Sequence, residues 1–182
     1  MRVIAGEFRS RLLESVPGLE TRPTPDRLRE TLFNILAPEI SGSVFLDAYA
    51  GSGAVGIEAL SRGAAAAVFI ENSKEAIGVI EANLKSLGLG GRATILRGCV
   101  RKKLAPGIAD IVFLDPPYAM DGEYVFALDV LGEQSGRAHV VVAQHSSRKK
   151  LAKEYQALAQ SRLVRQGENA LSLYRRPKTQ AN

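Results

Sequence analysis

The sequence predicts an α/β protein with a mostly parallel sheet of seven strands, which an antiparallel hairpin closes at the C-terminal end. Short apolar runs without polar alternation recur from residue 44 onward, a pattern typical of strands that are buried on both faces. Helical patterns alternate with these runs, and this alternation indicates a parallel sheet covered by helices. The last two runs, 162–164 and 170–174, flank Gly167 so closely that only an antiparallel connection fits between them.

The elements of the parallel part follow from the hydrophobic pattern. We expect strands at 44–46, 67–70, 93–96, 111–114 and 140–143. One helix should follow the first strand and stop near Gly63, and another should occupy the region around 125–131. Between them, Asn72 can cap a helix that has Glu75 three residues later and that ends at Gly88.

The first forty residues differ from the rest and are expected to form a small extension. Runs 2–5 and 8–13 resemble the two strands of a hairpin. Thr24, Pro25 and Asp26 then match a helix start, with a capping side chain, a proline in the first turn and an early acid. Pro38 should end this helix. We therefore divide the chain into an extension (1–40), a sheet domain (41–177) and a short disordered tail (178–182).

Composition and charge narrow the classes of protein. The chain has 182 residues and a net charge of +5, with a single cysteine, Cys99, and two histidines. These counts exclude an internal disulfide and leave no His/Cys metal site. No apolar run could span a bilayer and the first residues lack the long apolar region of a signal peptide, so a soluble cytoplasmic protein is expected.

The positive charge is concentrated near the C-terminus. Residues 137–182 contain ten Lys or Arg and two Glu, a local charge of +8, which leaves −3 for the rest. This asymmetry fits either a nucleic-acid partner or a solvated basic surface without one.

A glycine-rich segment, 47–56, connects the first parallel strand to its helix. Gly51 permits a tight turn, Gly53 lets a ligand approach the backbone, and Gly56 lets the helix pack closely on the sheet. Glu71 ends the next strand, 24 residues after Asp47, where a carboxylate can bind both ribose hydroxyls of an adenosine. Asp47 would repel a pyrophosphate but attract an ammonium, which favours S-adenosylmethionine over a dinucleotide. A packing loop without a ligand is the structural alternative.

A second motif, Asp115-Pro116-Pro117-Tyr118, ends the fourth strand. The prolines fix the backbone and leave nearby carbonyls free to accept hydrogen bonds. Asp115 adds a side-chain acceptor, and Tyr118 offers a flat face for stacking. The motif therefore suits a planar group that carries an exocyclic NH₂, although alone it could simply end a strand.

Asp-Pro-Pro-Tyr after a glycine-loop strand resembles the signature of amino-methyltransferases. Three longer segments (22–34, 46–53 and 57–64) are similar to the RsmD family, which methylates N2 of one guanine in small-subunit (16S) ribosomal RNA. The resemblance covers nearly the whole chain. It implies a Rossmann-like class I methyltransferase that uses S-adenosylmethionine, releases S-adenosylhomocysteine and needs no metal.

The resemblance also implies roles for single residues. Asp115 and the Pro116 carbonyl would accept the two N–H bonds of the target nitrogen, and Tyr118 would stack on a base that is flipped out or already unpaired. The expected catalytic residues are Asp115, Pro116, Pro117 and Tyr118. The expected cofactor-binding residues are Asp47, Tyr49, Gly51, Gly53, Glu71, Asn72 and Asp115.

Two positions depart from the family pattern. Gly98-Cys99 occupies the place where many relatives of the wider class have an acid near the adenine, so backbone groups are expected to recognise the adenine. We interpret Cys99 as an inert thiol. Tyr49 stands where phenylalanine is common, which keeps a flat apolar face.

Basic residues near both ends of the chain are candidates for RNA contact: Arg9, Arg11, Arg22, Arg27, Arg148, Lys149 and Lys150. The expected partner is small-subunit ribosomal RNA within an assembled or assembling subunit, bound by a monomer. Adenine N6 or a protein glutamine are alternative targets. A nucleotide-binding (NAD) oxidoreductase and a non-catalytic RNA-binding protein are alternatives of other classes.

Overall fold

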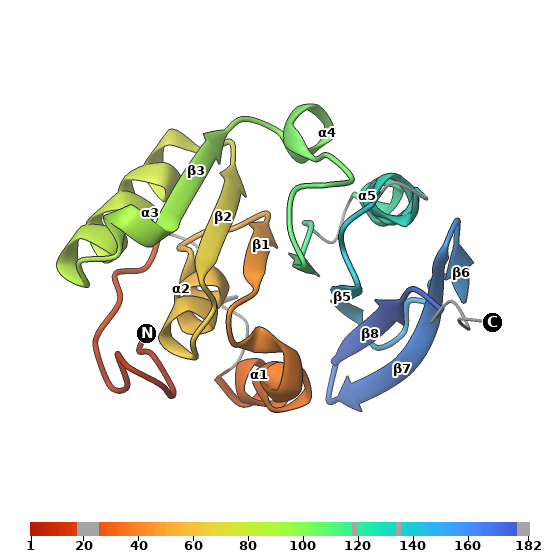
Figure 1. Cartoon of the computed structure of the whole chain (residues 1–182), viewed down its shortest axis with the longest axis horizontal. Helices are drawn as coiled ribbons and strands as arrows, with labels where there is room; N and C mark the ends of the chain where they lie inside the picture. Colours follow the sequence, from red (N-terminus) through yellow and green to blue (C-terminus); the bar gives the residue numbers. More distant parts are fainter. Residues whose placement is uncertain (18–25, 118–119, 134–135, 178–182) are drawn as a thin grey trace.

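The computed structural model describes residues 1–17, 26–117, 120–133 and 136–177, and within them one twisted sheet forms the centre of the molecule (Figure 1). The strands are β1 (Val44–Ala48), β2 (Ala66–Glu71), β3 (Ala93–Arg97), β4 (Ile111–Leu114), β5 (Val140–Ser146), β6 (Glu154–Tyr155), β7 (Leu158–Gln166) and β8 (Asn169–Arg175). The helices are α1 (Asp26–Ile40), α2 (Ala54–Ser61), α3 (Lys74–Ser86), α4 (Val100–Lys103) and α5 (Asp121–Gly132), with a 3₁₀ turn at Gly90–Arg92.

The strand order is β3-β2-β1-β4-β5-β8-β7-β6. The five strands from β3 to β5 are parallel, whereas β8, β7 and β6 join them in antiparallel pairs. The predicted parallel sheet with a closing hairpin is thus confirmed. The described part of the chain has eight strands instead of the expected seven, because the two residues of β6 extend the edge beyond β7. A strand this short leaves no hydrophobic pattern to detect.

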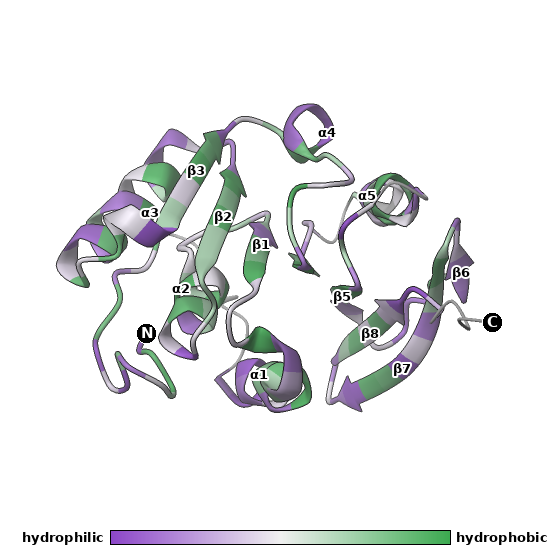
Figure 2. Cartoon of the chain, in the orientation of Figure 1, coloured by the Kyte–Doolittle hydropathy of each residue, from purple (hydrophilic) through white to green (hydrophobic). Residues whose placement is uncertain are grey.

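Helices cover both faces of the sheet. On one face, Phe45 of β1 and Phe113 of β4 pack with α1 and α2, and Phe69 of β2 packs with α2 and α3. On the other face, Leu46 and Val112 pack with α5. Consecutive residues of β1 therefore pack in opposite cores, which explains why the central strands are mostly apolar and why β1 and β2 are largely green in Figure 2.

Two helix boundaries differ from expectation. Pro38 lies inside the last turn of α1, which continues to Ile40. The proline removes one hydrogen bond, that to the carbonyl of residue 34, and the helix ends two residues later. Ser73, and not Asn72, caps α3: Ser73 Oγ accepts the Ala76 N–H at 3.3 Å. The predicted cap at Thr24-Pro25 lies outside the described residues.

The N-terminal segment folds back on itself before α1, although it forms no regular strands. One isolated antiparallel bridge joins Arg2 to Leu12. Instead of extending this pairing, the backbone binds α2: the N–H groups of Ile4 and Ala5 donate to the buried Glu58 carboxylate at 2.8 and 3.0 Å. Val3 still pairs across the turn, since its N–H donates to the Arg11 carbonyl at 3.0 Å. Ile4 and Ala5 donate to a side chain instead, which explains why the predicted hairpin remains rudimentary.

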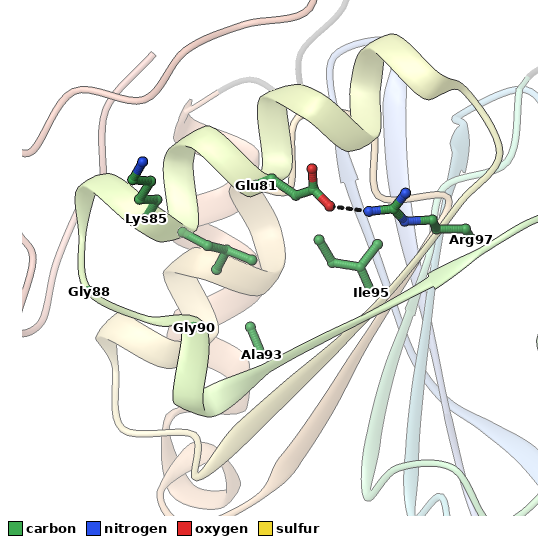
Figure 3. A pocket seen from close by; sticks show the side chains of 8 residues that line it. Glu81, Lys85, Gly88, Gly90, Ala93, Ile95 and Arg97 are labelled. Carbon is green, nitrogen blue, oxygen red and sulfur yellow. Dashed lines mark hydrogen bonds and ion pairs between the residues drawn. The ribbon is translucent and has the colours of Figure 1, made fainter.

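A hollow of about 590 Å³ lies between the edge strand β3 and helix α3 (Figure 3). Glu81 of α3 and Arg97 of β3 form an ion pair across it. Ile95 and Ala93 supply apolar lining on the strand side. This hollow flanks the sheet edge and lies apart from the glycine loop after β1. None of the helices in the described ranges has the length and apolarity that a bilayer crossing requires.

Candidate cofactor and catalytic site

The sheet reverses its strand order between β1 and β4. The chain runs from β1 outward to β2 and β3, then returns to β4 on the other side of β1. Ligands of open α/β sheets bind at such a switch point, beyond the carboxyl ends of the strands. Ala48 pairs with Leu114, so Tyr49 and Asp115 leave the sheet side by side at this point. The two predicted motifs therefore meet at one edge.

The glycine loop after β1 depends on three residues with positive φ. Tyr49, Gly51 and Gly53 have φ values of 74°, 54° and 76°. Gly53 is the N-cap of α2, and a Cβ there would lie 3.2 Å from Ile80. The left-handed conformation is natural for glycine and costs Tyr49 about 1–2 kcal/mol. The loop is thus held in a conformation that turns the start of α2 toward the switch point.

Glu71 holds this loop against the end of β2. Its Oε2 accepts the N–H of Gly51 at 2.8 Å, and its Oε1 accepts those of Asn72 and Ser73 at 2.8 and 2.9 Å. The carboxylate expected to bind a ribose thus also fixes the backbone on both sides of the crevice. Oε2 accepts one N–H and so has a second lone pair with which a ligand hydroxyl could bond.

Asp47 lies deeper than Glu71. Its side chain is 2% exposed, and its Oδ2 accepts the N–H of Gly56 at 2.8 Å. Burial, opposed by the Gly56 hydrogen bond and reinforced by Asp115 and Glu71, raises the pKa of Asp47 to about 8. The charges of Asp115 and Glu71 act on Asp47, so the three carboxyl groups gather at one edge. Such an acidic site repels a pyrophosphate and favours a cationic ligand.

The second motif lies beside the glycine loop. Asp115 is half-buried, Pro116 is buried and Pro117 is exposed. The Pro117 carbonyl accepts the Met120 N–H at 2.9 Å, which turns the chain into α5. Tyr118 lies outside the described residues, so its expected stacking role stays a prediction.

Sequence reasoning missed a polar network that crosses this edge. The Tyr49 hydroxyl donates to Glu123 Oε2 at 2.7 Å, and Arg101 Nε donates to Glu123 Oε1 at 2.6 Å. Burial of the Tyr49 hydroxyl raises its pKa, and the hydrogen bond to the Glu123 carboxylate raises it further, so the hydroxyl keeps its proton and remains a donor. Glu123 is 5% exposed and lies just after the second motif. The network therefore connects the glycine loop, α4 and α5, and Tyr49 contributes more than a flat face.

Asn83 is a second residue that the sequence did not single out. It is buried in α3, and its Nδ2 donates to the carbonyls of Ser52 and Glu14 at 3.2 and 3.1 Å. Its Oδ1 accepts the Glu14 N–H at 2.8 Å. The N-terminal segment and the glycine loop are thus fastened to the same helix. The sequence does carry one sign of this role, because Asn83 is a polar residue among the buried apolar residues of α3.

The predicted RNA-contact residues have different surroundings. Arg9 and Arg27 line a hollow of about 320 Å³ together with Asp26 and Glu30. Arg11 donates to the Ser86 carbonyl at 3.2 Å, and Arg22 lies outside the described residues. Arg148 and Lys150 are exposed beyond β5. Lys149 Nζ lies 4.6 Å from the centre of the Tyr124 ring.

Comparisons with known proteins agree with this arrangement. The family model described as "Conserved hypothetical protein 95" matches residues 1–175. The chain belongs to this family. It corresponds to the RsmD family that the motifs resemble: the chain is 44% identical over 121 residues to ribosomal RNA small subunit methyltransferase D of Escherichia coli. It is also 42% identical over 124 residues to YlbH of Bacillus subtilis, which is provisionally named an rRNA methyltransferase.

The matched regions cover only part of these relatives. They span 65% of this chain in both cases, 67% of YlbH and 60% of the E. coli protein. The solved structure of yhhF from Escherichia coli is similar over 97% of both chains, with a TM-score of 0.82 and 36% identity. The family membership and the Rossmann-like fold are therefore established for the described molecule.

Proposed function

We propose that this RsmD-family protein transfers a methyl group from S-adenosylmethionine to the exocyclic N2 of a guanine in small-subunit ribosomal RNA. The observation that carries the proposal is the meeting of two motifs at the β1/β4 switch point. There a glycine loop and three carboxyl groups lie beside an Asp-Pro-Pro turn. The names of the E. coli and B. subtilis relatives support the reaction class.

The acidic edge suits this cofactor. S-adenosylmethionine carries an ammonium and a sulfonium and no phosphate, so Asp47 and Asp115 would attract it. Glu71 would bind its ribose hydroxyls. The backbone of Gly51, Gly53 and Asn72 would lie against the cofactor, and Tyr49 would contact it from the start of the loop. A nicotinamide dinucleotide would bring a pyrophosphate to the same carboxylates, which argues against the oxidoreductase alternative.

Asp115 and the Pro116 carbonyl act on the target nitrogen. When bound, S-adenosylmethionine supplies an electrophilic methyl group and leaves as S-adenosylhomocysteine. The N2 lone pair of guanine is delocalised into the ring, so two acceptors that bind its N–H bonds would aim the lone pair at the methyl carbon. The new N–C bond would form as the C–S bond breaks, and N2 would then release one proton to water. Positioning supplies most of the rate in such a site.

The substrate we propose is an assembled or assembling small subunit, methylated in the cytoplasm by a monomer. The described residues form the sheet and the segments that cover it, and none of them makes up a separate RNA-binding domain, so a folded ribonucleoprotein surface would have to supply much of the recognition. Adenine N6 and protein glutamine present a similar NH₂ group to the second motif, and the resemblance of segments 22–34, 46–53 and 57–64 to the RsmD family favours guanine over both.

Replacing the acceptor in the second motif tests the proposal. We expect Asp115→Asn to lower the rate of methyl transfer from labelled S-adenosylmethionine to undermethylated small subunits at least 100-fold, because the amide cannot accept as strongly and offers its own N–H donors. Binding of subunits should stay within about threefold. Full methyl transfer by Asp115→Asn would overturn the catalytic role, and a wild-type protein that binds subunits without methylating them would favour a non-catalytic RNA-binding protein.

A further inference from the structure

The C-terminal positive charge is divided between two kinds of residue. Three arginines serve the fold: Arg137 forms two hydrogen bonds to Asp110 (2.6 and 2.9 Å), Arg175 forms two to Glu39 (both 2.7 Å), and Arg176 donates to the carbonyls of Leu131, Glu133 and Ala138. The excess that is left for a partner is therefore smaller than the count of ten basic residues suggests, and its location can be specified.

Strand pairing brings Arg165 of β7 close to the end of β5, which Arg148, Lys149 and Lys150 follow. His145 of β5 pairs with Ala170 of β8, which in turn pairs with Arg165 of β7. Paired residues of antiparallel strands point to the same face, so Arg165 shares the face of His145. The Ser147 N–H donates to the Glu168 carbonyl at 2.8 Å, which joins the segment after β5 to the β7–β8 turn. We call the resulting cluster of Arg148, Lys149, Lys150 and Arg165 the β5–β8 basic edge.

A buried histidine, His145, lies beneath the basic edge. His145 is 2% exposed, and its Nδ1 lies 2.8 Å from the Ser146 carbonyl, which can only accept. The ring must therefore donate from Nδ1 and accept from the Ser172 hydroxyl at Nε2, also at 2.8 Å. Burial lowers the pKa of His145, and the charges of Lys149 and Arg165 lower it further. Both cations thus converge on one neutral ring.

Lys149 is held over α5. Its Nζ lies 4.6 Å from the ring centre of Tyr124, and the Tyr124 hydroxyl donates to the Gln144 carbonyl at 2.8 Å. Arg148, Lys150 and Arg165 are exposed around it. Glu168, in the turn between β7 and β8, is the acidic residue next to the four basic residues of this edge. The edge therefore has a fixed centre, an exposed rim and a net positive charge.

The basic edge adjoins the catalytic motif. Leu114 pairs with Ala143, so Asp115 lies one strand away from β5 and two residues short of Ser146. With strands about 4.8 Å apart and a rise of about 3.3 Å per residue, the two backbones are roughly 8 Å apart. A base that enters the site has flanking phosphates within this range, and contacts to flanking nucleotides commonly hold a flipped base.

We propose that the β5–β8 basic edge binds the phosphate backbone of the RNA strand next to the target base. The inference rests on the proposed function, because it takes RNA as the substrate. The N-terminal arginines are less suited, since Arg9 and Arg27 share their hollow with Asp26 and Glu30. Backbone contacts of this kind position a substrate and give its binding a strong dependence on salt.

Arg162 offers a matched control for Arg165. Both are exposed arginines of β7, but Arg162 pairs with Leu173, which packs in the core on the α1 side. The two side chains therefore point to opposite faces of the same strand. Neither has an ion pair among the residues that the structure describes, so each can be replaced without removing a fold-stabilising partner.

The experiment compares Arg148→Gln/Arg165→Gln with Arg162→Gln and wild type, using undermethylated small subunits at several KCl concentrations. We expect the double variant to raise the Kd for subunits about 10-fold or more and to flatten the slope of log K against log[KCl] by about two, one for each lost phosphate contact. Arg162→Gln should stay within twofold of wild type. Binding of S-adenosylmethionine should not change in any variant, which separates RNA contact from damage to the site.

Equal loss in Arg162→Gln and the double variant, or an unchanged salt slope, would overturn the proposed surface. The two proposals fail differently. If the wild-type protein methylates subunits and the double variant binds them as tightly as wild type, only the proposed RNA contact of the basic edge is contradicted. Wild-type protein that binds subunits through this edge but transfers no methyl group would contradict the proposed function alone.

Discussion

At the scale of single residues, two aspartates at neighbouring strand ends have different surroundings. Asp47 is buried and bonded to Gly56, whereas Asp115 is half-buried at the mouth of the site. Burial and two neighbouring carboxyl groups raise the pKa of Asp47 to about 8. Asp47 therefore holds a proton at neutral pH until a cation compensates its charge, and only the more exposed Asp115 is suited to bind a substrate N–H directly.

This pKa predicts how stability depends on pH. The folded protein keeps a proton on Asp47 up to about pH 8, whereas the unfolded chain loses it near pH 4. Stability from this group is thus full below pH 4 and is lost as the pH rises toward 8. Asn cannot titrate but can still accept the Gly56 N–H. We expect the stability of Asp47→Asn relative to wild type to increase over this range by up to about 1.4 kcal/mol per pH unit.

Urea unfolding at pH 4 to 8 measures this difference. Parallel pH profiles of the free energy of unfolding for the variant and wild type would contradict the raised pKa.

At the scale of elements, the approach of α2 to the sheet determines the shape of the glycine loop. A Cβ on Gly56 would lie 2.3 Å from the Phe69 ring, which is fully buried. Helix α2 can therefore lie this close to β2 only because residue 56 has no side chain. The contact keeps Gly53, at the start of α2, in line with the end of β1.

A pair of glycine substitutions tests this contact. Gly56→Ala should destabilise the protein by about 1–3 kcal/mol, because the added methyl group overpacks a buried core. Gly78 lies in the exposed part of α3, and a Cβ added there would meet no atom within 4 Å. Gly78→Ala should therefore stabilise the protein by about 0.5–1 kcal/mol through helix propensity. Equal effects of the two substitutions on urea unfolding would show that the close approach is absent.

The elements and the site differ in how far the sequence can predict them. Buried parallel strands leave apolar runs, so the pattern places β4 at its observed bounds, 111–114. The pattern does not decide the cap of α3, because Asn72 and Ser73 are both good caps and only the backbone geometry distinguishes them. The contact of Tyr49 with Glu123 joins residues 74 positions apart, and the sequence carries no local signal for such a pairing.

At the scale of the whole molecule, the basic charge and the acidic site lie side by side. The carboxyl groups of Asp47, Glu71 and Asp115 gather at the carboxyl ends of β1, β2 and β4, and the basic edge begins one strand further on, at the end of β5. The net charge of +5 conceals this division. A cationic cofactor and an anionic polymer can thus approach neighbouring parts of the same sheet edge without competing for the same groups.

Mapping the modified nucleotide tests the central claim most directly. Undermethylated small subunits and labelled S-adenosylmethionine are incubated with wild-type protein, with Asp115→Asn as the control, and the labelled nucleoside is identified by mass spectrometry. We predict that one guanine of the small-subunit RNA gains a single methyl group at N2, and that a short free hairpin of the same sequence is methylated far more slowly. Label on an adenine, on a ribosomal protein or on no component of the subunit would contradict the account.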